Sequence, residues 1–84
     1  MLHCDNISVE IPEWDGVRRE VMELWRMEKK TQVAVCAVWT HPDGAELRLA
    51  VDGKLQLANA THHVWALSIV AMSWNEGFAI RGWR

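Results

Sequence analysis

The chain has 84 residues and a mass of 9.7 kDa, which corresponds to one small domain, residues 1–84, with a single modest core. Half of the residues are hydrophobic, and nine basic against eleven acidic residues give a net charge of −2 at pH 7. This composition excludes an intrinsically disordered chain, and no apolar run is long enough for a transmembrane helix. We therefore expect a globular domain without a membrane partner.

The N-terminal segment, residues 1–12, has no basic cluster followed by an apolar run, so a cytoplasmic location is expected. The two cysteines, Cys4 and Cys36, are too few for a disulfide-scaffolded secreted domain, and we expect two reduced thiols. Cys36 lies in a β-branched run, where a cysteine is more often a small buried hydrophobe than a nucleophile.

Residues 14–30 are predicted to form an amphipathic helix. Their apolar residues recur at helical spacing within an arc of about 100°, namely Trp14, Val17, Val21, Leu24 and Trp25. Pro12 suits the first turn of such a helix, and Lys29 and Lys30 suit its C-terminal end. Gly16 has no explanation in this helix.

Residues 31–40 are apolar at both odd and even positions, as expected of a strand covered on both faces. The His-Pro-Asp-Gly sequence that follows predicts a type I turn closed by a glycine bulge. This turn pairs His41 with Ala45 and Trp39 with Leu47.

The next turn, at Asp52-Gly53, allows two registers. A two-residue turn would split the apolar residues between the two faces of the sheet, so we favour a type I turn with Gly53 as the bulge, which pairs Leu49 with Leu55. The inner face is then predicted to consist of Val33, Val35, Ala37, Trp39, Leu47, Leu49, Leu55 and Leu57. The other face carries Ala34, Cys36, Val38, Arg48, Ala50, Gln56 and Ala58.

A second helix is predicted to extend to Arg81, with Thr61 as the better N-cap candidate and Gly82 as the stop. A competing stop lies at Asn75-Glu76-Gly77. One apolar stripe of this helix should pack on the sheet, and it consists of Val64, Leu67, Ala71, Trp74 and Phe78.

A second apolar stripe on the same helix points elsewhere. It consists of Trp65, Ile69, Met72 and Ile80, interrupted by Glu76. One short meander cannot cover both stripes of the helix. If the second stripe is exposed, it forms the kind of contiguous apolar patch that marks a partner or ligand site. Cover by the N-terminal segment is an alternative.

The predicted fold class is α+β, in the order helix, three-stranded antiparallel meander, helix (α-β-β-β-α). Both helices lie on the Leu47 face, and Ile7 to Ile11 is a candidate N-terminal edge strand. This order resembles that of double-stranded-RNA-binding domains, in topology only. That family reaches phosphates with a lysine cluster at the start of its second helix, where this chain has Thr61-His62-His63-Val64. We therefore expect no nucleic-acid partner.

No motif of catalysis or cofactor binding is found in the sequence. The histidines and cysteines lack metal-ligand spacing, and neither a nucleophile elbow nor a glycine-rich phosphate loop occurs. We therefore predict no catalytic residues, no metal and no cofactor.

Two functional hypotheses remain. The first is a non-enzymatic protein-interaction module, homodimeric through Trp65, Ile69, Met72 and Ile80. The second is a small-ligand or enzyme module whose pocket lies between the helices and the sheet or between subunits, using Trp39, His41, His62 or His63. The small apolar residues around Cys36 on the second sheet face are an alternative dimer surface, and the sequence does not rank the surfaces.

Overall fold

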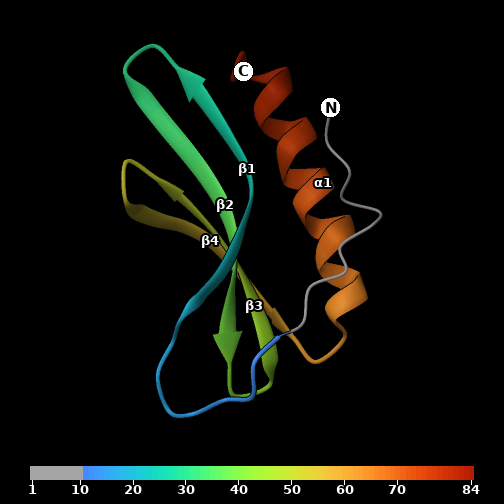
Figure 1. Ribbon diagram of the computed structural model, residues 1–84. Helices are drawn as coiled ribbons and strands as arrows, with labels where there is room; N and C mark the ends of the chain where they lie inside the picture. Colours follow the sequence, from blue (N-terminus) through green and yellow to red (C-terminus); the bar gives the residue numbers. More distant parts are fainter. Residues whose placement is uncertain (1–10) are drawn as a thin grey trace.

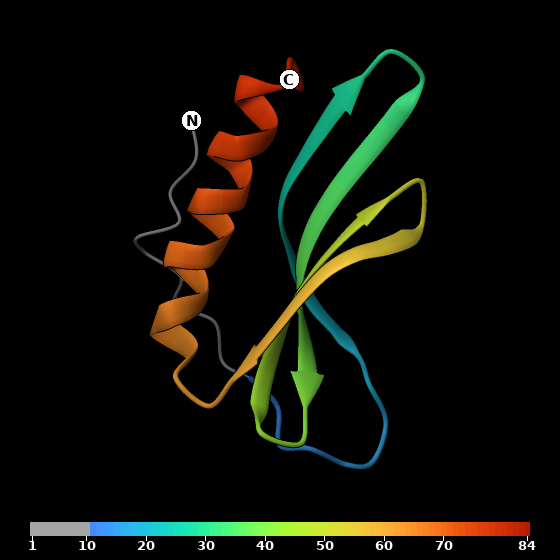
Figure 2. The same ribbon diagram turned by 180° about the vertical axis from the view of Figure 1, so that it is seen from behind.

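The computed structural model describes residues 11–84, which form four strands and one helix (Figure 1). The elements are β1 (Glu20–Lys29), β2 (Gln32–His41), β3 (Gly44–Val51), β4 (Lys54–Thr61) and α1 (Val64–Ile80). The strands form an antiparallel meander in the order β1-β2-β3-β4, and α1 lies on one side of the twisted sheet (Figures 1 and 2). The predicted α-β-β-β-α order is therefore wrong, and so is the topological resemblance that rested on it.

The predicted first helix is instead a bend followed by β1. The Asp15 carboxylate accepts a hydrogen bond from the backbone N–H of Val17 at 3.1 Å, and Gly16 adopts a φ of +92°. This Asx turn takes the chain out of helical geometry and accounts for the glycine that a helix leaves unexplained. Trp14, the first apolar residue of the predicted helix, lies exposed before the bend.

Two β-bulges give β1 its helix-like spacing of apolar residues. The register against β2 shifts between Glu20 and Met22 and again between Glu23 and Trp25, so Val21 and Leu24 are extra residues. A bulge adds one residue to the strand period of two and produces a spacing of three. The apolar positions of β1 thus imitate a helical period although the backbone is extended.

β2 and β3 are offset by one residue from the predicted register. The chain makes a two-residue turn in which His41 pairs with Gly44, so Val38 rather than Trp39 lies opposite Leu47. A slip of one residue moves every side chain of a strand to the opposite face. The predicted inner face of β2 is therefore its outer face, and Ala34, Cys36 and Val38 are fully buried.

The β3–β4 turn is the two-residue Asp52-Gly53 turn, which the sequence argument rejected. Both residues have positive φ, 51° and 81°, as in a type I′ hairpin turn. A bulge inside β4, between the pairs Ala50–Leu55 and Leu49–Leu57, then returns Leu57 to the face of Leu49. The predicted glycine bulge at Gly53 and the pairing of Leu49 with Leu55 are therefore wrong, because Leu49 lies opposite Leu57 and Leu55 lies opposite Ala50.

The core lies between the sheet and α1. Its buried residues come from β1, β2, β3 and the helix, and they are Trp25, Met27, Ala34, Cys36, Val38, Ala45, Leu47, Leu49, Leu67, Ala71 and Phe78. The predicted inner stripe of α1 packs here on the Leu47 face, which confirms that part of the helix prediction. The indole Nε1 of Trp25 donates to the carbonyl of Ala71 at 3.0 Å and fixes α1 against β1.

α1 begins two residues later than predicted and ends where expected. Thr61 is the last residue of β4, and its hydroxyl accepts a hydrogen bond from the His63 N–H at 2.9 Å, so His63 is the N-cap position. At the other end the Gly82 and Trp83 N–H groups donate to Ala79 and Phe78, with φ +93° at Gly82. This is a Schellman motif, and the Trp83 ring packs on Phe78 at 5.1 Å.

Some expectations fall on the first ten residues, which are outside the described range. These include Cys4 and most of the candidate edge strand Ile7 to Ile11, although Ile11 itself is described and is not in a strand. Within residues 11–84, no helix has the length and apolar character needed to cross a bilayer.

Candidate functional site

The second apolar stripe of α1, here called the outer stripe, consists of Trp65, Ile69, Met72 and Ile80. The four residues are exposed, with 68%, 61%, 37% and 85% of their surface accessible. α1 has seventeen residues, of which only Glu76 is charged. A helix that is apolar on two opposite sides usually has both of those sides covered. Within residues 11–84, the structure covers one of those sides, the side that faces the sheet.

The outer stripe points directly away from the sheet. At about 100° per residue, its centre lies nearly opposite the buried Leu67, Ala71 and Phe78. At its N-terminal end the Trp65 ring lies 6.0 Å from the ring of His63. The stripe therefore runs along the side of the helix that faces away from the sheet, and Glu76 interrupts it between Met72 and Ile80.

β4 is a second exposed apolar element. It is the last strand of the sheet, and every residue from Lys54 to Ala60 is exposed, including Leu55 at 48% and Leu57 at 42%. No charged residue follows Lys54 in this strand. Edge strands usually carry charges, bulges or covers that prevent pairing with other chains. β4 has a bulge but few other protections.

The opposite edge of the sheet, along β1, is better protected. β1 has two bulges, and near its end the backbone of Glu28 exchanges two hydrogen bonds with Arg84, at 2.6 and 2.9 Å. The Lys29 ammonium also donates to the carbonyl of Arg81 at 2.7 Å. The C-terminal residues thus cover the end of the β1 edge, and among residues 11–84 no strand pairs with the outer edge of β4.

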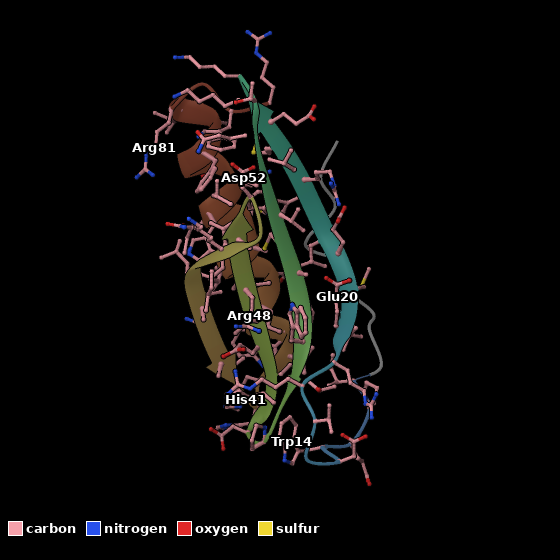
Figure 3. The ribbon with its side chains drawn as sticks, turned by 90° about the vertical axis from the view of Figure 1, so that its left-hand side faces the viewer. Trp14, Glu20, His41, Arg48, Asp52 and Arg81 are labelled. Atoms are coloured by element: carbon pink, nitrogen blue, oxygen red, sulfur yellow. The ribbon has the colours of Figure 1, made fainter. Side chains whose placement is uncertain are left out.

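A concave hollow of about 470 Å³ lies on the outer face of the sheet, away from α1. It is lined from all four strands and the last turn, by Glu20, Glu23, Arg26, Val35, Ala37, Trp39, Arg48, Ala50, Gly53 and Leu55. Figure 3 views this face and shows Glu20 on β1 and Arg48 on β3 to either side of β2. Its volume lies within the range of small-molecule sites.

A buried carboxylate organises the charges beside this hollow. Glu46 is only 7% exposed, and its Oε1 lies 3.1 Å from Arg18 Nη1 and 3.4 Å from Arg48 Nε. The Arg48 guanidinium also lies 5.1 Å from the centre of the Trp39 ring. Two guanidinium groups share one carboxylate, so the cluster carries a surplus positive charge.

Sequence reasoning missed this cluster because the register was one residue off. The signal that could have found it is the alternation in β3, where Glu46 and Arg48 separate Ala45, Leu47 and Leu49. That alternation marks one polar face on a central strand.

On the rim of the hollow, Glu23 and Arg26 form an ion pair at 2.8 Å. The hydrogen bond from Arg26 holds the pKa of the Glu23 carboxyl below its ordinary value of 4.5. A carboxyl with a lowered pKa stabilises the folded state above its unfolded pKa, and this contribution is lost as the pH falls through the lowered value.

We expect Arg26→Gln to return the pKa of Glu23 towards 4.5, because the substitution removes the charged hydrogen-bond donor. A carboxyl NMR titration measures the change. The control is Asp15, whose pKa is lowered mainly by the Val17 N–H and also by Arg19. Its titration should not move, and an equal shift of both carboxyls would contradict the assignment.

The residues named for a possible ligand or catalytic site do not form one constellation. Trp39 lines the outer face, whereas the rings of His62 and His63 lie 4.0 Å apart at a tilt of 47°, beside the start of α1. The His41 Nδ1 accepts a hydrogen bond from the Asp43 N–H at 3.1 Å and so belongs to the turn. No group of three or more His, Cys, Asp or Glu in residues 11–84 is arranged to hold a metal ion.

Cys36 and its neighbours on the predicted second face do not form a surface. Ala34, Cys36 and Val38 are buried beneath α1, whereas Ala50 and Ala58 lie on the outer side. The dimer surface proposed for that face therefore does not exist.

Comparisons with protein-family models, curated proteins and solved structures find no match to this chain.

Proposed function

We propose that this protein is a non-enzymatic interaction module that forms a homodimer through the outer stripe of α1. The observation that carries the proposal is the exposure of Trp65, Ile69 and Ile80 on a helix with a single charge. Burying them against a second copy adds apolar contact to a domain whose own core is small. A self-complementary patch paired about a two-fold axis is the commonest way to form a dimer.

The position of Glu76 favours an antiparallel helix pair. In a parallel pair, the two Glu76 carboxylates would face each other inside the apolar stripe, and like charges at close range repel. An antiparallel pair separates them and also aligns the helix dipoles favourably. The two-fold axis then passes near Met72 and Ser73, and Trp65 of one copy lies beside Ile80 of the other.

Trp65→Glu and Ile69→Glu are expected to convert the dimer to a folded monomer. Each introduces a carboxylate where the second copy would remove water, at a position that the monomer leaves exposed. Sedimentation velocity measures the mass, and circular dichroism checks the fold. The matched control is Leu57→Glu, an exposed apolar residue on β4. A monomer with Leu57→Glu but not with Trp65→Glu would move the interface to β4 and overturn the proposal.

A cysteine cross-link tests the axis itself. In a Cys4→Ser background, Met72→Cys is expected to form an intermolecular disulfide, because a residue near a two-fold axis meets its own copy. Trp65→Cys is the control, since its copy would lie about 22 Å away along the antiparallel helices. Equal cross-linking of both variants would contradict this arrangement.

A further inference from the structure

The hollow on the outer face of the sheet is charged at one end and mainly apolar at the other. At the charged end Glu20 pairs with Trp39 across β1 and β2, and Arg48 lies two residues further along β3 than Glu46, the partner of Trp39. At the other end Val35 pairs with Ala50, and Ala50 pairs with Leu55. Arg26 pairs with Val35 on the β1 side of this end and is engaged there by Glu23. This polarity suits a small amphiphilic molecule lying along the strands.

Arg48 supplies a site for an anionic group. Its Nε is buried and faces Glu46 Oε1 at 3.4 Å without a hydrogen bond in the part of the chain that the structure describes, so a ligand in the hollow meets the 25% of the side-chain surface that is exposed. Glu46 is also engaged by Arg18, so it neutralises neither arginine fully. Trp39 lies under the guanidinium at 5.1 Å and fixes its orientation. A guanidinium held in this way is well suited to bind a carboxylate.

Glu20 supplies a site for a cationic group. It makes no ion pair within residues 11–84, whereas the neighbouring Glu23 is engaged by Arg26 at 2.8 Å. Glu20 and Arg48 lie on β1 and β3 (Figure 3), two strand spacings apart across the sheet and two residues apart along it, so their backbones are about 12 Å apart. The Arg48 guanidinium lies over Trp39, the cross-strand partner of Glu20, which brings the two charges closer together than their backbones. An α-amino acid that makes one hydrogen bond at each end is of the size to bridge two such side chains.

We propose that this hollow binds a small zwitterion, an α-amino acid with an apolar side chain. Its carboxylate lies on Arg48, its ammonium on Glu20, and its side chain over Val35, Ala50 and Leu55. The side chain is of leucine size or larger, because the hollow of about 470 Å³ extends over the apolar end of the sheet. This site is independent of the proposed dimer, since α1 lies on the other side of the sheet (Figure 2).

The test compares three ligands that differ only in their charges: L-phenylalanine, 3-phenylpropionate without the ammonium, and phenethylamine without the carboxylate. Binding is followed by calorimetry and by NMR shifts of the hollow residues, with ligand up to about 1 mM. We expect L-phenylalanine to bind at least about tenfold more tightly than either analogue, because only it engages both charges. No binding by L-phenylalanine, or equal binding by all three, overturns the proposal.

Glu20→Gln is the matching variant, because Glu20 is exposed and contributes no ion pair to the described fold. We expect it to bind L-phenylalanine and 3-phenylpropionate equally. The control is Glu28→Gln, which changes an exposed glutamate of the same strand outside the hollow and should keep the tenfold preference. Loss of the preference in both variants would contradict the role of Glu20. A Trp65→Glu monomer should still bind, so failure of the dimer and failure of this site are separable.

Discussion

Val38→Asp is expected to unfold the domain or to lower its free energy of unfolding by about 4 kcal/mol or more. Val38 is fully buried between the sheet and α1, so the new carboxylate would lose its hydration without gaining a partner. A small domain has only about 5–15 kcal/mol of stability in total. Urea denaturation, followed by circular dichroism, measures the change.

The matched variant is Val35→Asp, on the same central strand three residues earlier. Val35 lines the outer hollow and pairs with Arg26 across β1 and β2, so its carboxylate stays near water and a cation. We expect this variant to remain folded and to lose only about 1 kcal/mol, the scale of strand propensity. The reverse order of stability would mean that β2 has the register predicted from the sequence.

Gly44→Ala is expected to destabilise the fold by about 3 kcal/mol, because two costs act together. Gly44 has a φ of +129°, and a Cβ there would lie 2.8 Å from the Thr61 carbonyl oxygen and 2.9 Å from the His62 Cα. Both neighbours are backbone atoms, at the junction of β4 and α1, and neither can rotate away. The measurement is again the free energy of unfolding in urea.

Gly77→Ala is the control and should have the opposite sign. Gly77 lies within α1, has no positive φ, and a Cβ there would meet nothing within 4 Å. Alanine in a helix interior is about 0.5–1 kcal/mol more favourable than glycine. If Gly44→Ala were as harmless as Gly77→Ala, the close approach of the β2–β3 turn to His62 would be wrong.

The sequence predicts the C-terminal helix better than the N-terminal strand, for a physical reason. α1 has an uninterrupted helical period and a Gly82 stop, and both are confirmed. β1 has bulges at Val21 and Leu24, which turn a period of two into steps that resemble a helix. A bulge is fixed by pairing with another strand, so no local pattern distinguishes it from a helical spacing.

The prediction of which sheet face lies in the core depended on one turn, the turn between β2 and β3. Both a glycine bulge and a two-residue turn suit the sequence from His41 to Gly44, and they place opposite faces of β2 in the core. The sequence of β2 does not show which of its two faces lies in the core, because Val35 and Ala37 on one face and Val38 on the other are all apolar. The alternation of Glu46 and Arg48 in β3 would have decided it.

The two candidate sites also differ in whether the sequence alone could predict them. The outer stripe depends only on the helical period, so its residues could be named from the sequence and are exposed in the structure. The outer hollow depends on which residues of neighbouring strands share a face. The cluster of Trp39, Glu46 and Arg48 was therefore out of reach once the register was wrong.

The most direct test of the proposed homodimer is the mass of the intact chain in solution. Multi-angle light scattering over a dilution series at moderate salt measures it without labels or substitutions. Pairing through the outer stripe predicts a species of twice 9.7 kDa that dissociates only at low concentration. A monomer throughout the series would contradict the dimer and leave Trp65 and Ile69 exposed to water.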